Sequence, residues 1–411
     1  MFSFPYPIKS RQAKEEIFLL KPTAGKERIA DLDYIRGFAL IGILLVNMPL
    51  FSGAEYQTYT GADRVIRLIF DLFVQAKFYT IFSFLFGVGF YLFVSRALVK
   101  GYSLNLYKKR ITGLLLIGLV HLIFFWKGDI LAIYAVSGFL AVPFFRKEPY
   151  EIRNWGFVLI GVFLIVFVIL PSLMAWTMQP SSGKTDPELM RAFDPEKAEQ
   201  TIRAFQQLSL WEWVKWRFQY EVLDSFVNQL VVIPNILGLF LLGLYAGKIG
   251  LFSNAASYRQ PLHRIQIWMA ALSLPSLTAI ILLYAAGEHA ALYNQTFVTV
   301  SGFTLGIGYI VTLILLLQNS GVKRWLKPLS AYGQMALTNY LLHTVISVSL
   351  FVPGHLYRKI GLRQGVLISV FLTVIQITLS NWWLCHFRFG PAEWAWRCFT
   401  YGQLQPLKKS G

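Results

Sequence analysis

Residues 78–98 read FYTIFSFLFGVGFYLFVSRAL, in which Arg96 is the only charged side chain. A helix of about 20 apolar residues is long enough to cross the ~30 Å hydrocarbon core of a lipid bilayer. About ten blocks of this kind follow one another along the chain. We therefore predict an all-α fold, a polytopic integral membrane bundle of about ten transmembrane helices with both termini in the cytoplasm.

The composition agrees with this class of protein. Hydrophobic residues make up 55% of the chain and charged residues only 14%, which is more apolar surface than a soluble core can bury. The net charge of +17 is spread over short clusters between the apolar blocks, so nucleic acid is not an expected partner. Cys385 and Cys398 are too few for a disulfide framework or a cysteine metal site.

The apolar blocks divide the chain into two bundles. We expect a cytoplasmic tail at 1–30, five spans within 31–176, an extracytoplasmic loop at 177–225, five spans within 226–386 and a cytoplasmic interfacial segment at 387–411. The ten spans are expected near 36–51, 78–98, 111–126, 130–145, 155–176, 226–246, 265–286, 296–317, 329–351 and 365–385. We expect no cleavable signal peptide before the first span.

Charge sets the expected orientation. Basic clusters precede the first span and follow each even-numbered one, and such clusters stay on the cytoplasmic side. The exception is Arg358, Lys359 and Arg363 between the ninth and tenth spans, where a re-entrant or displaced segment is an alternative.

In the long loop, the run from Leu210 to Trp216 is interpreted either as an interfacial amphipathic helix or as a helix that caps the bundle.

Ionisable side chains inside a membrane span are costly, so each one is a candidate for a site. In the first span, Asp33 and Arg36 are three residues apart and share a helix face. Asn47 lies eleven residues beyond Arg36, at almost the same angle around the helix. This polar stripe is predicted to bind a substrate or cofactor, and the alternative is an ion pair that locks the start of the helix.

A second polar layer is predicted nearer the outside, with Asp71 and Lys77 before the second span, His121 in the third and Asp129 in the turn after it. His121 is the preferred general acid or base because imidazole titrates near neutral pH. The alternative is an imidazole hydrogen-bonded to a neighbouring helix. Asp129 is eight residues away, about 12 Å along a helix, so we expect no direct contact with His121 unless the helix breaks.

Two more polar pairs lie toward the C-terminus. Asn339 and His343 share one face of the ninth span and form a second candidate wall, although amides also link membrane helices by hydrogen bonds. Glu393 and Arg397 share a face of a short interfacial helix, where we expect no direct chemistry. The chain has no phosphate-cradling Gly-Lys-Ser/Thr loop, nucleophile elbow or paired-histidine zinc helix, and no metal is predicted.

Five blocks of sequence carry a resemblance to a known family. They are LDYIRGFAL at 32–40 with Asn47, KF at 77–78 with FSFLFG at 82–87, His121 with GDIL at 128–131, ALTNYLL at 336–342, and FGPAEWAWR at 389–397. Together they resemble the domain-of-unknown-function 418 family, the YeiB-like bacterial membrane proteins, over nearly the whole chain. This resemblance implies a location in the inner membrane of a bacterial cell.

The Asp-x-x-Arg-Gly opening is also similar to the transmembrane acyltransferase superfamily, which includes lysosomal heparan N-acetyltransferase and bacterial sugar O-acyltransferases. That similarity implies transfer of an acyl group from a cytoplasmic donor such as acyl-CoA to an acceptor across the membrane, with a histidine near the second span as base. Residues 56–75 contain no histidine, so the role would pass to His121, Asp71 or Lys77. The family resemblance implies that glutamine is common at the position of His343.

Three functions remain open. In a membrane acyltransferase, the leading hypothesis, Arg36 and the basic cytoplasmic mouth hold an anionic donor, and His121 deprotonates a small-molecule, glycan or lipid acceptor that Asp129 and Asn47 orient. In a secondary transporter or exporter, the ionisable groups of both layers line a path. The third is a non-catalytic envelope protein. The lipid bilayer is the expected partner, and the sequence leaves oligomer formation open.

Overall fold

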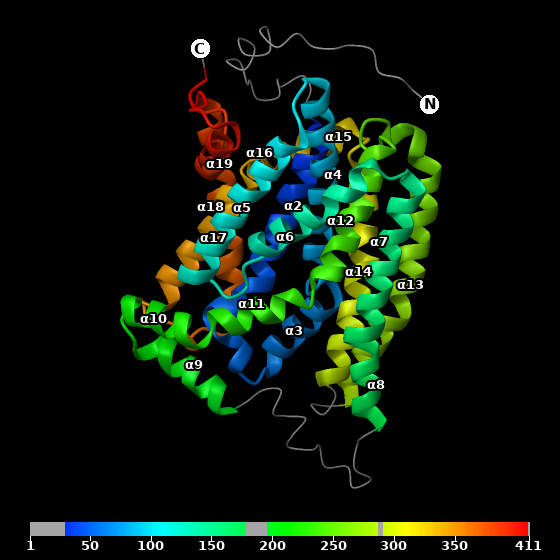
Figure 1. Ribbon diagram of the computed structural model, residues 1–411. Helices are drawn as coiled ribbons and strands as arrows, with labels where there is room; N and C mark the ends of the chain where they lie inside the picture. The colour runs from blue at the N-terminus through cyan, green and yellow to red at the C-terminus, as the bar shows by residue number, and fades with distance from the viewer. Residues whose placement is uncertain (1–28, 178–194, 287–290, 410–411) are drawn as a thin grey trace.

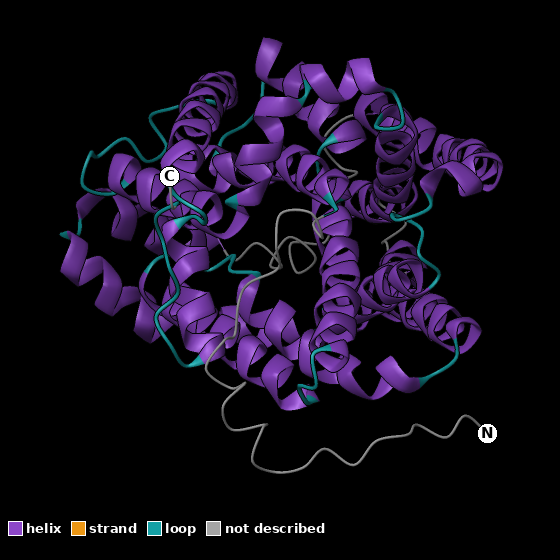
Figure 2. Cartoon of the chain, turned by 90° about the horizontal axis from the view of Figure 1, so that it is seen from above, coloured by secondary structure: helices purple, strands orange, loops and turns teal. Residues whose placement is uncertain are grey.

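The computed structural model describes residues 29–177, 195–286 and 291–409, and the regular elements in these ranges are helices (Figure 1, Figure 2). The first part contains α2 Ala30–Ser52, η3 Ala54–Tyr56, α3 Gly61–Phe73, α4 Lys77–Val99, α5 Leu104–Phe124, α6 Leu131–Ala141, η4 Val142–Arg146, α7 Pro149–Phe163, η5 Leu164–Ile169 and α8 Leu170–Thr177. The second contains α9 Pro195–Gln207, α10 Leu210–Tyr220, α11 Val222–Leu230, α12 Ile233–Lys248, η7 Ala255–Tyr258 and α13 Arg259–Ala286. The third contains α14 Ala291–Leu316, α15 Ser320–Trp325, α16 Lys327–Gln334, α17 Ala336–Phe351, α18 Leu362–His386 and α19 Pro391–Tyr401. The predicted all-α class is confirmed.

The number of full spans is smaller than predicted. Six helical segments of the described chain are long and apolar enough to cross a membrane, not ten. They are Ala30–Ser52, Gly61–Val99, Pro149–Met174, Ala255–Ala286, Asn294–Leu316 and Leu362–His386. A seventh results if α11 and α12, which meet at a bend of 54°, form one broken span. The fold is a polytopic membrane bundle that combines full spans with shorter helices.

Two of the blocks that fall short are brief or interrupted helices, and a third belongs to a longer helix with charged first turns. The block expected at 130–145 forms α6, whose 11 residues give a length of roughly 16 Å, followed by a 3-10 segment. The block at 329–351 is split at Met335 into α16 and the 16-residue α17. The block at 111–126 belongs to α5, whose first turns carry Lys108, Lys109 and Arg110. Apolar composition alone does not indicate where a helix ends inside a buried block.

A backbone contact between α4 and α12 lies at the core of the bundle. A Cβ added at Gly87 would lie 1.9 Å from the carbonyl oxygen of Phe240, and one added at Gly243 would lie 1.9 Å from that of Phe84. Only glycine allows the two backbones to approach so closely. Small residues commonly serve this purpose between membrane helices.

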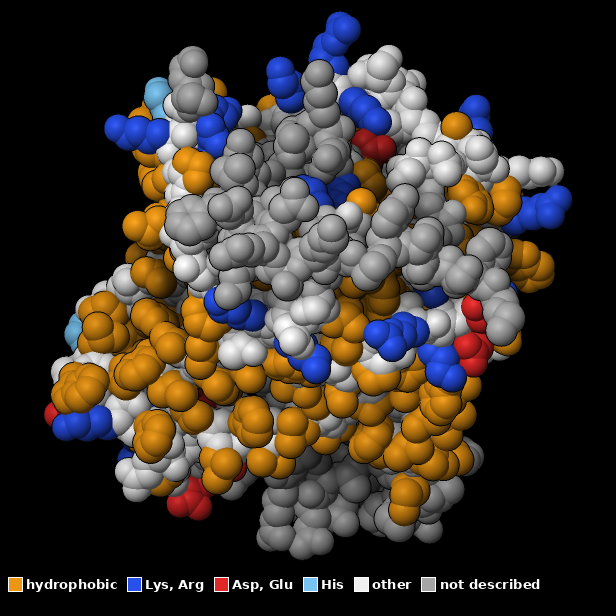
Figure 3. Space-filling view, turned by 45° about the horizontal axis from the view of Figure 1, so that its top comes forward, with side chains coloured by type: hydrophobic (Ala, Val, Ile, Leu, Met, Phe, Trp, Pro, Cys, Tyr) orange, Lys and Arg blue, Asp and Glu red, His pale blue; other side chains and the backbone are white. Residues whose placement is uncertain are grey.

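The bundle has two ends, named here after helices that cover them. The α19 end holds α15, α16 and α19, and the α10 end holds α3, α9, α10 and α11 (Figure 1). Lys and Arg side chains gather over the α19 end, whereas hydrophobic side chains cover the flank below it (Figure 3). Exposed apolar residues such as Phe157 on α7 and Trp268 on α13 belong to such flanks. A surface of this kind is suited to contact with lipid.

Candidate functional site

A buried pair, His121 and Asp129, lies where α5 turns into α6. α5 ends three residues after His121, and the amides of Phe125 and Trp126 both donate to the His121 carbonyl oxygen. The turn brings Asp129 back, so that its Oδ1 lies 2.8 Å from Nδ1 of His121 while its Oδ2 accepts from the Ala132 amide at 2.8 Å. The direct contact is the stated exception: α5 ends at Phe124, and the 12 Å estimate holds only for a continuous helix.

The surroundings of the imidazole suit a general base. His121 and Asp129 are both buried, and with Nδ1 facing the carboxylate the ring proton is assigned to Nδ1. The lone pair is then on Nε2, which is buried and has no hydrogen-bond partner among the described residues. Tyr340 of α17 packs on the ring at 5.3 Å between centroids. A histidine held by a carboxylate at one nitrogen and without a partner at the other can accept a proton from a hydroxyl or amine.

An apolar groove of about 390 Å³ lies beside this pair, between the end of α5, α10 and α17. It is lined by Phe124, Phe125, Leu210, Trp211, Trp213, Val214, Val345, Val348 and Ser349. Phe125 connects the groove to the pair, because its ring stacks on His121 at 6.3 Å between centroids. The lining is suited to an apolar chain.

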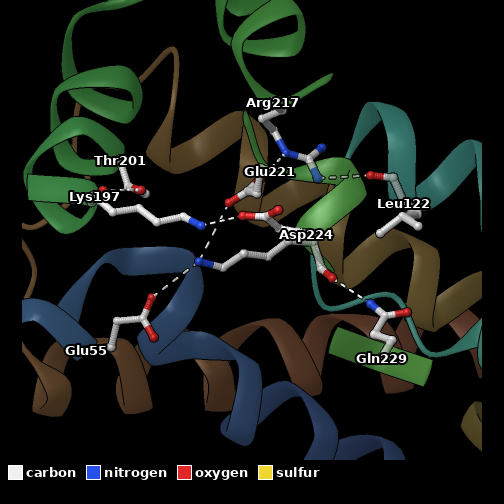
Figure 4. A network of polar contacts seen from close by, with 9 residues as sticks. Glu55, Leu122, Lys197, Thr201, Arg217, Glu221, Asp224 and Gln229 are labelled. Carbon is white, nitrogen blue, oxygen red and sulfur yellow. Dashed lines mark hydrogen bonds and ion pairs between the residues drawn. The ribbon is translucent and has the colours of Figure 1, made fainter. Parts of the chain in front are cut away.

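Arg217 of α10 closes the end of α5 (Figure 4). Its Nη2 donates to the Leu122 carbonyl at 2.9 Å, its Nη1 donates to the Ile123 carbonyl at 3.4 Å, and its Nε donates to Glu221 at 2.6 Å. Carbonyls in the last turn of a helix lack intrahelical partners, and a cation there also complements the helix dipole. The sequence interpretation missed Arg217, although its spacing of four from Glu221 was a readable signal.

Both interpretations of the run from Leu210 to Trp216 describe part of α10. Trp213 and Arg217 are buried against the bundle, so the helix caps it. Trp211 on the same helix is 63% exposed, which presents an indole at the surface. α10 therefore joins the bundle core to its periphery at the end that holds the buried pair.

Lys127 extends the Arg217 network to the segment after α2. Its Nζ lies 3.7 Å from Glu221 and 3.9 Å from Glu55, and its carbonyl accepts from Gln229 at 2.7 Å. Burial raises the pKa of Glu55 above its ordinary value, against the lowering effect of Lys127. Burial alone would lower the pKa of Lys127, but the two carboxylates reverse this and raise it. Contacts from η3, from the junction of α10 and α11, and from α11 therefore hold the turn that carries Asp129 (Figure 4).

Asp71 and Lys77 form a separate cluster between α3, α4, α13 and α14. The Asp71 carboxylate accepts from the Tyr284 hydroxyl at 2.6 Å and pairs with Arg67 at 3.0 Å. Lys77 is fully buried, and its Nζ donates to the backbone carbonyl of Asp71 at 2.7 Å and to Ser301 Oγ at 3.0 Å. Within the described residues no hydrogen bond or ion pair joins this cluster to the pair at the α5–α6 turn. The residues of the predicted outer layer therefore form two separate sites, one with Asp71 and Lys77 and one with His121 and Asp129.

Asp33 and Arg36 pair on one face of α2, as predicted, with 3.0 Å between Oδ1 and Nη1. The neighbouring Asp31 lies 2.8 Å from Lys323 of α15, which places this pair toward the α19 end. Asn47 is half-buried farther along α2 and makes no hydrogen bond to the pair in the described chain. The predicted stripe is thus an ion pair near one end of the helix and a separate amide.

Asn339 and His343 link three helices. Asn339 Nδ2 donates to the Tyr332 carbonyl and to Ser380 Oγ, each at 3.0 Å. His343 Nε2 lies 2.8 Å from the Tyr332 hydroxyl. These bonds join α16, α17 and α18, which supports the interpretation of Asn339 as an inter-helix link. The side chain of α17 that reaches the imidazole of the buried pair is Tyr340.

These features define a class of protein, a helical polytopic membrane protein with a buried ionisable pair toward one end of its bundle and a partly buried one toward the other. Nowhere in 29–177, 195–286 or 291–409 do three or more His, Cys, Asp or Glu side chains gather in a way that could hold a metal ion. The chain belongs to the DUF418 family. The family model, described as "Protein of unknown function (DUF418)", matches residues 246–403.

The relatives extend this match to nearly the whole chain. The sequence is 31% identical to the uncharacterized protein YxaH of Bacillus subtilis (strain 168), over 95% of this chain and 98% of the relative. It is 31% identical to an uncharacterized 39.9 kDa protein from the amylase 3' region of Bacillus acidopullulyticus, over 94% and 98%, and 27% identical to the uncharacterized protein YeiB of Escherichia coli (strain K12), over 92% and 98%. The predicted family membership is confirmed.

Proposed function

We propose that this protein is an acyltransferase embedded in the bacterial inner membrane. The observation that carries the proposal is the buried pair of His121 and Asp129, in which Nδ1 is held by the carboxylate and Nε2 has no partner among the described residues. The apolar groove beside the pair is suited to an acceptor or acyl group with a hydrocarbon chain.

The proposed reaction begins with an acceptor hydroxyl or amine next to Nε2 of His121. The imidazole takes the proton while the acceptor oxygen or nitrogen attacks the carbonyl carbon of an acyl thioester such as acyl-CoA. The carbon–sulfur bond then breaks, and the leaving thiolate receives the proton from the imidazolium. Asp129 keeps Nδ1 protonated and stabilises the imidazolium in between.

The proposed orientation places the α19 end in the cytoplasm. Lys and Arg side chains gather over that end (Figure 3), and basic residues beside membrane spans are retained on the cytoplasmic side. Arg36 lies toward the same end and would meet an anionic donor there. The buried pair would then serve an acceptor that approaches from the membrane or from outside.

The test compares H121A with the wild type in nanodiscs supplied with radiolabelled acetyl-CoA and a cell-envelope extract. The matched control is H263A, which replaces an exposed histidine on α13. We expect label transfer or slow donor hydrolysis to fall about 10²- to 10⁴-fold in H121A and to stay unchanged in H263A. Equal rates in H121A and the wild type contradict the assignment of His121 as base.

A secondary transporter is the second candidate, favoured by the fully buried Lys77 in the cluster between α3, α4 and α14. A transporter moves unmodified substrate, responds to the proton gradient and needs no acyl donor. Gradient-driven uptake that is lost in K77Q, without any acyl transfer by the wild type, would favour transport. Tolerance of both H121A and K77Q in every assay would favour a non-catalytic envelope protein.

A further inference from the structure

A second group of polar and aromatic side chains lies at the α19 end, away from the buried pair. Arg110 in the second turn of α5 packs its guanidinium against two rings, with 3.7 Å from Cζ to the centroid of Trp396 on α19 and 4.9 Å to that of Phe93 on α4. Arg36 and Arg397 are the other cations whose charges act on Arg110. Arginines from α2, α5 and α19 are therefore close enough to interact electrostatically.

The contact of Arg36 places it on the face of α4 that carries Phe93, whereas Arg397 is placed by its neighbours in the C-terminal segment. A Cβ added at Gly89 would lie 3.7 Å from Nη2 of Arg36, and Gly89 is one helical turn before Phe93. Arg397 follows Trp396 directly, and its Cζ lies 4.3 Å from the ring centroid of Phe389. The cluster is thus built from aromatic rings and arginines of separate helices.

The Arg110 guanidinium makes no hydrogen bond and no ion pair within the described residues. Ring stacking fixes its plane and leaves its N–H groups for a ligand. A guanidinium presents five donors in a planar fork that matches phosphate oxygens. Like charges held close together repel; the Asp33 carboxylate offsets part of this repulsion at Arg36, and a bound polyanion would reduce the rest.

α5 connects this cluster to the buried pair. Arg110 and His121 are eleven residues apart on one continuous helix, so their directions differ by roughly 20° at about 100° per residue. At 1.5 Å per residue they are roughly 16 Å apart along the axis. The two side chains therefore lie on the same face of α5, one toward each end of the bundle.

We propose that Arg110, together with Arg36 and Arg397, binds the phosphate groups of the donor whose acyl carbonyl is held at His121. This inference rests on the proposed acyltransferase function and names the donor class. The donor is a phosphorylated compound in which a flexible arm of roughly 16 Å joins the anionic head to the acyl thioester. A lipid headgroup is the other source of phosphate that the same guanidinium groups would accept.

The test measures binding to the purified full-length protein in phosphatidylcholine nanodiscs by calorimetry, with inorganic pyrophosphate and with coenzyme A. We expect R110Q to weaken the binding of both ligands about tenfold or more, since a charge-assisted hydrogen bond is lost. K108Q removes an exposed cation two residues earlier and should bind as the wild type does. H121A should leave pyrophosphate binding unchanged. R397Q is the second variant if R110Q does not fold.

The outcomes separate this site from the proposed function. Equal pyrophosphate affinity in the wild type, R110Q and R397Q overturns the anion site. Loss of pyrophosphate and coenzyme A binding in R110Q supports it even if no acyl transfer is detected, in which case only the acyltransferase proposal fails. If phosphatidic acid in the nanodiscs is bound through Arg110 while coenzyme A is not, the occupant is a lipid headgroup and the soluble donor is overturned.

Discussion

At the scale of single residues, Asp129 has two tasks that a substitution can separate. D129N keeps an oxygen for the Ala132 amide but does not hold the Nδ1 proton of His121 as a carboxylate does. We expect acyl transfer to fall about 10²- to 10⁴-fold with little change in unfolding temperature. The rate is measured with labelled acetyl-CoA, and D224N on exposed α11 is the control. A normal rate in D129N contradicts a role for the carboxylate.

Glu393 supports a prediction about pH. It accepts hydrogen bonds from the Leu337 amide at 2.7 Å and the Thr338 hydroxyl at 2.5 Å, at the start of α17. Burial raises its pKa above the ordinary 4.5, and the hydrogen bonds oppose this only in part. The folded state therefore holds the proton more tightly than the unfolded state, and this stabilising contribution is full below about pH 4.5 and lost as the pH rises through the raised pKa.

E393Q has no proton to release, so its unfolding temperature should lack this component. The unfolding temperatures of the wild type and E393Q are measured from about pH 4 to 8. As the pH rises, the unfolding temperature of the wild type should fall relative to that of E393Q. A difference that stays constant across this range would show that Glu393 does not titrate in it. E199Q, an exposed position on α9, controls for the change in net charge.

Single-residue predictions from the sequence succeeded where only local geometry mattered. The contact of Asp33 with Arg36 follows from a spacing of three on a helix that continues past both. The contact of His121 with Asp129 depends on where α5 ends, which the apolar sequence around it does not specify. Arg217 comes from an element almost a hundred residues away, and spacing within one helix carries no information about such a partner.

At the scale of elements, the anchoring of α10 to α5 yields a stability prediction. R217M removes the charge that binds two carbonyls of α5 and leaves Glu221 with Lys127 as its remaining ionic partner. Breaking a buried ion pair of this kind costs about 3–5 kcal/mol. We expect a clear drop in unfolding temperature in nanodiscs, followed by tryptophan fluorescence, while K215M on the exposed side of α10 changes it little.

The double variant R217M/E221M tests the cause of that loss. If the cost comes from a carboxylate left in a buried position, removal of both charges should recover part of the stability. A double variant no more stable than R217M would mean that the carbonyl contacts, rather than the ion pair, dominate. Either result is read from the same unfolding temperatures.

Helix existence was easier to predict from the sequence than helix extent. The blocks at 78–98 and 365–385 lie within α4 and α18, because each is a long apolar run without a break. The block at 329–351 contains a break at Met335 that its composition does not reveal, and the ten expected spans therefore become six full ones. Side chains from other elements satisfy backbone groups at such ends, as Glu393 does for the Leu337 amide at the start of α17.

At the scale of the whole molecule, orientation is the prediction to check. Cys385 at the end of α18 is exposed, so in a C398S background a membrane-impermeant maleimide should label it only in inside-out vesicles. W211C in a cysteine-free background should be labelled only in right-side-out spheroplasts, because α10 lies at the opposite end. The reverse pattern would place the α19 end outside and contradict a cytoplasmic donor.

The glycine contact between α4 and α12 has a consequence for motion. Where Gly87 and Gly243 meet carbonyl oxygens of the opposite helix, no side chain separates the backbones, so neither helix can slide past the other without a clash. α4 carries Lys77 in the cluster with Asp71 at its start and Phe93 beneath Arg110 near its end. The two helices therefore form a rigid unit. Any rocking motion that moves a substrate must be made by the helices around them.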